Sequence, residues 1–80
     1  MTTYYELHVT AKTKTEREYL HRLVIAYFLE RDEFKTREAE RLEGKTVITP
    51  LYLHKPTDFT AFCSLARTIA RATGAEIFLN

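Results

Sequence analysis

The N-terminal segment alternates between apolar and polar side chains with a period of two residues. In YYELHVTAK, residues 4–12, the apolar set consists of Tyr5, Leu7, Val9 and Ala11. Because successive strand residues point to opposite faces, this set predicts a strand that buries one side in a core. The other face is less ordinary, because it combines polar residues with an aromatic ring and an imidazole, in the set Tyr4, Glu6, His8 and Thr10.

A helix is predicted after this strand. Overlapping capping signatures at residues 13–16 and 15–18 each place a hydroxyl where it accepts the free N–H of the third helical residue. Apolar residues then recur at three- and four-residue spacing and predict one buried stripe, formed by Leu20, Leu23, Val24 and Tyr27, with Phe34 in phase if the helix continues. At about 100° per residue, Ile25 and Leu29 fall nearly opposite this stripe, so we expect this pair to face outward.

Residues 34–43 admit two interpretations. They are largely good helix formers without glycine or proline, so the first helix can continue through them. They also alternate as a strand that turns through Glu43 and Gly44 into the β-branched residues 45–54, with mixed charges that suit an exposed edge. We favour this hairpin. Pro50 then indicates an edge or a bulge in the second strand, because proline has no N–H to donate.

The second half of the chain contains the clearest helix. Pro56, Thr57 and Asp58 form a capping cluster, and Gly74 ends the helical pattern. Between them runs a continuous apolar stripe made of Phe59, Phe62, Cys63, Ala66, Ile69 and Ala70. We expect Cys63 to behave there as a small hydrophobic residue.

The last residues, AEIFLN, predict a short terminal strand with Ile77 and Leu79 inward and Glu76 and Phe78 outward. The element order is therefore strand, helix, strand, strand, helix, strand. For a single domain of residues 1–80 we predict an α+β fold, a ferredoxin-like βαββαβ sandwich whose antiparallel sheet carries two helices on one face. The alternative is βαβαβ with a long first helix.

Composition narrows the function classes. With 45% hydrophobic residues and a net charge of +1, the chain is a folded domain without a dominant basic patch. A single cysteine excludes an intrachain disulfide, and no apolar run is long enough to cross a membrane. The first residues lack the features of a signal peptide. We therefore expect a cytoplasmic protein that has no membrane partner.

Alternation gathers several aromatic and imidazole side chains on the sheet face that the helices leave uncovered, namely Tyr4, His8, Tyr52, His54 and Phe78. A contiguous exposed aromatic patch indicates a contact surface. We predict that a partner binds to this patch, to the Ile25 and Leu29 side of the first helix, or to both. Arg67 and Arg71, one helical turn apart, are candidates for contact with an anion or an acidic partner.

These surfaces predict a small non-enzymatic protein-binding module, a regulator or inhibitor that works as a homodimer, without cofactor or metal. One alternative is single-stranded nucleic-acid binding through the open face with Arg67 and Arg71, since aromatic side chains on a sheet stack bases. Another is a small metal-dependent enzyme that uses His8 and His54 with Glu6 nearby, although the sequence has no HExxH or CxxC motif.

Overall fold

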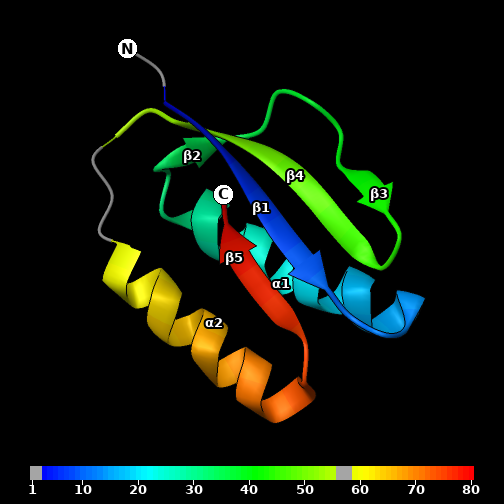
Figure 1. The fold of residues 1–80 in the computed structure, drawn as a ribbon. Helices are drawn as coiled ribbons and strands as arrows, with labels where there is room; N and C mark the ends of the chain where they lie inside the picture. The colour runs from blue at the N-terminus through cyan, green and yellow to red at the C-terminus, as the bar shows by residue number, and fades with distance from the viewer. Residues whose placement is uncertain (1–2, 56–58) are drawn as a thin grey trace.

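The computed structural model describes residues 3–55 and 59–80, which form five strands and two helices. In chain order the elements are β1 (Thr3–Thr10), α1 (Lys14–Glu30), β2 (Phe34–Lys35), β3 (Arg41–Glu43), β4 (Thr46–Leu53), α2 (Phe59–Thr73) and β5 (Glu76–Leu79). All the strands belong to one antiparallel sheet, with β1 and β4 at its centre and β5 at one edge. Both helices pack on the same face of this sheet (Figure 1).

The α+β class is therefore confirmed. The alternative with a long first helix is wrong, because α1 ends at Glu30 and residues 34–43 contain no helical turn. The strand order β2-β4-β1-β5, with β3 also paired to β4, differs from the four-strand plan predicted above. The difference arises because the single strand expected at residues 34–42 is divided into β2 and β3.

Pro50 explains why this edge strand is divided. β2 pairs with β4 as far as Tyr52, and β3 resumes the pairing at Ile48. On the other side of β4, Pro50 lies opposite Glu6, whose own N–H and C=O bond to Asn80 at 3.0 and 2.8 Å. By the alternation of antiparallel pairing, the backbone nitrogen of Pro50 must face the β2–β3 side. It has no hydrogen to donate there, and the neighbouring chain is interrupted between β2 and β3. β4 itself is a central strand that pairs with β1 in an unbroken register, so the predicted edge position or bulge at Pro50 is wrong.

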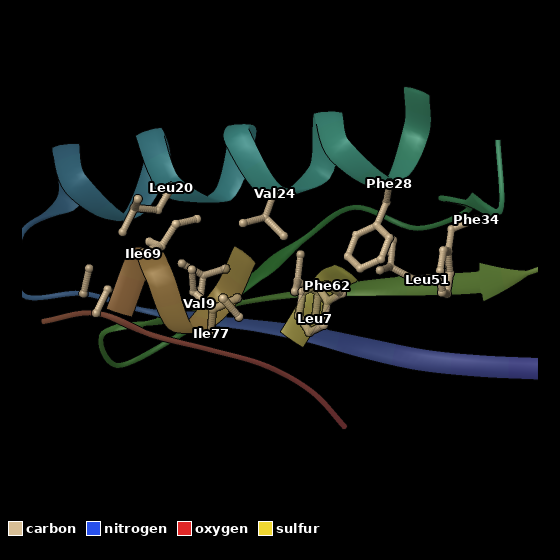
Figure 2. Packing of buried hydrophobic residues seen from close by; sticks show 13 residues of the cluster. Leu7, Val9, Leu20, Val24, Phe28, Phe34, Leu51, Phe62, Ile69 and Ile77 are labelled. Carbon is tan, nitrogen blue, oxygen red and sulfur yellow. The ribbon is translucent and has the colours of Figure 1, made fainter. Parts of the chain in front are cut away.

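The core fills the space between the sheet and the two helices (Figure 2). The sheet contributes Leu7, Val9, Leu51 and Ile77, and the helices contribute Leu20, Val24, Phe28, Phe62, Ala66 and Ile69. The Phe28 ring centroid lies 4.8 Å from that of Phe34 and 5.2 Å from that of Phe62. These aromatic contacts connect α1 to β2 and to α2, so Phe28 sits where three elements meet.

The buried stripe of α1 differs from the predicted one. Leu20, Val24 and Phe28 are the buried residues, at four-residue spacing, whereas Leu23 is 43% exposed. Ile25 packs against the core and does not face outward, which corrects the prediction for this residue. Leu29 is exposed, as expected. The helix takes this rotation because it brings the large Phe28 ring into the core.

The ends of the elements follow local signals. The Thr13 hydroxyl accepts a hydrogen bond from the Glu16 N–H at 3.2 Å and caps α1, as predicted. Gly74, with a φ of +75°, follows the last residue of α2. The hairpin turn lies at Gly44 and Lys45, one residue later than expected, with a φ of +61° at Gly44. The predicted cap of α2 at residues 56–58 lies outside the described residues.

Candidate protein-binding surfaces

A groove of about 780 Å³ runs between α2 and β5 at the edge of the sheet, where Figure 1 shows the two elements side by side. Its floor consists of the buried core residues Phe62, Ala66 and Ile77. The rest of its lining is mostly apolar and includes Phe59, Cys63, Ala70 and Leu79. This volume falls within the range of roughly 300–1,000 Å³ that is usual for binding clefts.

The groove exists because α2 has a wider apolar stripe than the sheet covers. β5 is the last strand, so no further strand lies beneath the outer part of that stripe. Small side chains on this side of α2, at Cys63, Ala66 and Ala70, leave the space open. Cys63 is consequently exposed, which corrects the expectation that its thiol is buried within the stripe.

The outer edge of β5 lies along this groove without a partner strand. Glu6 and Asn80 exchange both of their backbone hydrogen bonds, so the antiparallel alternation directs the N–H and C=O groups of Ile77 and Leu79 away from β1. In the part of the chain that the structure describes, no loop or cap hydrogen bond engages these groups. Such an edge is a template for a further strand.

One rim of the groove is positively charged. Arg67 lines it and Arg71 lies one helical turn further along α2, both exposed. No acidic residue occurs within α2, and neither arginine forms an ion pair with any described residue. The predicted cationic pair is thus accessible and uncompensated on the helix side of the molecule.

The open sheet face holds four of the predicted contact residues in two pairs. The ring centroids of Tyr4 and Tyr52 are 5.3 Å apart, and His8 stacks on Phe78 at 4.6 Å. Tyr4 and Phe78 are the more exposed members, at 47% and 45%. His54 is not part of this group, because it lies beyond the end of β4 with its Nε2 3.5 Å from an Asp32 carboxylate oxygen.

Glu6 links the side chains at the centre of this face. Arg41 Nη2 lies 2.8 Å from Glu6 Oε2, and the Tyr4 hydroxyl donates to the same oxygen at 2.9 Å. The guanidinium first, and then the hydroxyl, lower the pKa of Glu6, so it is a carboxylate at neutral pH. Since β4 lies between β3 and β1, the Arg41 side chain crosses it and helps to cover Ile48, which is only 2% exposed.

Tyr52 is held by the chain between β2 and β3. The Arg37 guanidinium carbon lies 4.8 Å from the Tyr52 ring centroid, and the Tyr52 hydroxyl donates to Glu38 at 3.1 Å. Desolvation, followed by the hydrogen bond to Glu38, raises the pKa of Tyr52. This part of the aromatic patch is therefore covered by the protein itself, and less of it is free for a partner than the sequence predicted.

The two histidines of the metal-enzyme alternative do not come together. His8 lies opposite Ile48, which is about 20 Å from His54 along the chain at roughly 3.3 Å per residue. The nearest carboxylate oxygen to His8 in an ion pair belongs to Glu6, at 3.4 Å. Within residues 3–55 and 59–80, no group of three or more histidine, cysteine, aspartate or glutamate side chains is arranged to hold a metal ion.

The outer side of α1 forms a second apolar surface. Tyr19, Leu23 and Leu29 are exposed by 65%, 43% and 45%. Leu29 belongs to the predicted partner-binding set, whereas Leu23 was expected in the core. At about 100° per residue, Tyr19 and Leu23 share one side of α1, and Leu29 lies about 120° around the helix from Leu23. The exposed part of α1 between them is a candidate contact surface.

Sequence reasoning gave His21 no role, yet it makes a polar contact inside the fold. Its Nε2 shares a hydrogen bond with the hydroxyl of Thr49, which is only 3% exposed on the helix-facing side of β4. The signal in the sequence is Thr49 itself, a lone hydroxyl among the inward residues of that strand. A buried hydroxyl requires a partner, and α1 supplies it.

We expect the free energy of unfolding to decrease as the pH falls below about 6.5, the ordinary histidine pKa. Burial lowers the pKa of His21 in the folded state, with Glu40 opposing and Arg22 adding to this shift. Between the two pKa values the unfolded chain binds a proton that the folded chain does not, so acid favours unfolding. Urea denaturation from pH 7.5 to pH 5 measures the slope, which should become shallower in His21→Gln. An unchanged slope in that variant would contradict the assignment.

The comparisons with known proteins give no match to a protein-family model, a curated protein or a solved structure. Of the helices in the described ranges, neither has the length and apolar character needed to cross a membrane. The functional assignment therefore depends on the surfaces described above.

Proposed function

We propose that this chain is a small, non-enzymatic protein-binding module whose docking site is the α2–β5 groove. The observation that carries the proposal is the coincidence of an apolar groove with an unpaired strand edge. Apolar concavities bind by burying a partner's side chains, and a strand edge adds directional backbone hydrogen bonds. These features fit a regulator or inhibitor that acts in the cytoplasm by binding an exposed segment of another protein in its groove.

The arrangement of charge favours a protein partner over single-stranded nucleic acid. The exposed rings of Tyr4 and Phe78 lie on the open face, whereas Arg67 and Arg71 lie on α2 behind the sheet. Stacking on these rings and phosphate contact with these arginines therefore do not share one surface. On the open face, the positive charge of Arg41 is already paired with the carboxylates of Glu6 and Glu43. Nucleic-acid binding remains an alternative proposal, with salt-dependent binding of single-stranded RNA as its test.

We further propose that the fold is a variant of the ferredoxin-like plan. If β2 and β3 are regarded as one strand interrupted opposite Pro50, the element order becomes βαββαβ with both helices on one face. The interruption matters for function because Arg37 and Glu38, which lie within it, contact Tyr52 and cover this part of the open face.

We also propose that two copies associate through the outer side of α1. The exposed side chains of Tyr19, Leu23 and Leu29 support this assignment. A single domain of this size buries a small share of its surface, and association adds burial. This surface lies on a different helix from the groove, so a dimer and a groove-bound partner are compatible.

Peptide selection tests the docking site. Random peptides selected on the whole chain should yield binders whose affinity falls at least about tenfold, or about 1.4 kcal/mol, in Ala70→Arg, because this side chain enters the groove. Ala72→Arg is the matched control, since Ala72 is exposed on the same helix and does not line the groove. The affinity of the selected peptides for Ala72→Arg should stay within about twofold of their affinity for the wild-type protein. Both variants should retain the wild-type circular dichroism spectrum. Equal binding to the two variants would refute the proposed site.

A further inference from the structure

We propose that the occupant of the groove is an extended segment of a partner protein that pairs with β5 as an additional strand and presents an acidic side chain to Arg67. This inference rests on the proposed function, because it names the class of partner and the mode of binding. Three independent features support it: the direction of the backbone groups, the position of the groove relative to the strand, and the charge of the rim.

The outer edge of β5 presents backbone N–H and C=O groups that can pair with a further strand. Ile77 and Leu79 each direct one N–H and one C=O away from β1, as the Glu6–Asn80 pairing requires. A guest strand opposite these residues satisfies all four groups. Because the hydrogen bonds are made by the backbone, this step selects an extended conformation and sets no requirement on the guest sequence.

Successive side chains of the guest strand then point alternately to the helix side and to the open face of the sheet. Guest residues opposite Ile77 and Leu79 point to the helix side, as those two residues do, and enter the groove beside Cys63 and Ala70. The residues between them point to the open face beside Phe78, which is 45% exposed. The groove therefore selects a segment whose groove-side residues are apolar where they meet Cys63 and Ala70.

The rim adds a requirement for negative charge. Arg67 lines the groove and has no acidic neighbour on α2 or ion pair with the described chain. A guest carboxylate on the helix side therefore gains a charge-assisted hydrogen bond without displacing an existing partner. Glu76, at the start of β5, is exposed and also lines the groove, so it repels an acidic guest residue near that end. The acidic residue is therefore expected beside Arg67 and away from Glu76.

A second copy of this chain fits the groove less well. If β5 paired with the β5 of another copy, the two α2 helices would lie close together. Each brings Arg67 and Arg71 and no acidic residue, so the guanidinium groups would repel one another. The charge of the rim therefore favours an acidic partner segment over self-pairing.

The backbone part of this inference is tested with N-methylated peptides. In a selected peptide, methylation removes one N–H at a time, so each amide is replaced in turn and the affinity for the whole chain is measured. Methylation of amides that face β5 should weaken binding at least about tenfold, and methylation of the intervening amides should change it less than about threefold, which gives a period of two. Equal losses at all positions would overturn strand addition.

A double-mutant cycle tests the charge. Replacing the peptide's acidic residue by glutamine, or Arg67 by glutamine, should each weaken binding about five- to tenfold, and the two changes together should cost little more than either one. Arg22→Gln on α1 is the control and should have no effect, since Arg22 is exposed and does not line the groove. Additive losses would overturn the pairing of the acid with Arg67.

The outcomes separate this inference from the proposed function. If Ala70→Arg abolishes binding while the methylation pattern and the cycle both fail, the groove remains a protein-binding site and strand addition is wrong. If light scattering shows self-association that Ala70→Arg abolishes, the occupant is a second copy. If decanoate displaces a groove-bound dye and the selected peptides do not, the occupant is an acyl chain. Each of the last two results overturns the inference.

Discussion

Replacing Phe28 by alanine is expected to lower the free energy of unfolding by about 3–5 kcal/mol. The Phe28 side chain is 1% exposed and contacts the rings of Phe34 and Phe62, so its removal leaves a cavity where α1, α2 and β2 meet. Domains of this kind have a total stability on the order of 5–15 kcal/mol. The variant should therefore unfold at a much lower urea concentration or lack a cooperative transition.

The control for this prediction is the same substitution at Phe78. That ring is 45% exposed and stacks on His8, so Phe78→Ala removes surface contacts and creates no internal cavity. Its cost should stay below about 1.5 kcal/mol. If urea denaturation gives the two variants equal midpoints, Phe28 does not have the central position assigned to it.

The double variant Leu23→Asp/Leu29→Asp is expected to convert the protein from a dimer to a monomer. Both leucines are exposed on α1, so two new carboxylates on each copy place like charges in the proposed interface without disturbing the core. Light scattering on the wild-type protein should give twice the mass of one chain, and the variant should give the mass of a single chain.

Thr68→Asp on the exposed side of α2 is the control, because it adds a carboxylate to a different helix. It should give the same mass as the wild-type protein. A wild-type protein that is monomeric at high concentration would rule out the α1 interface. The monomeric variant should still bind selected peptides, since the groove lies between α2 and β5.

The sequence was sufficient for elements that depend on local patterns. The alternation around Leu7 and Val9 predicted β1, and the Thr13 cap and Gly74 marked helix ends at the residues observed. These signals act within a few residues, because alternation, capping and positive φ are properties of the local backbone. The outward orientation of Tyr4 and Phe78 follows from the same alternation.

Contacts between distant segments decided which side of α1 is buried. The packing of Phe28 against Phe34 and Phe62 set the rotation of α1, which turned Ile25 partly into the core and exposed Leu23. The apolar pattern of α1 permits more than one buried side, and only the partners in the fold distinguish them.

The candidate site shows the same division. The sequence determined that α2 has a continuous apolar stripe and two arginines, and that β5 is a short final strand. Only the tertiary structure placed β5 at the sheet edge, left the Cys63 and Ala70 side of α2 uncovered, and covered Tyr52 with Arg37 and Glu38. The physical reason is that a groove forms where the apolar surface of one element extends beyond the element packed against it. The sequence of α2 or of β5 alone does not determine how much of α2 the strand will cover.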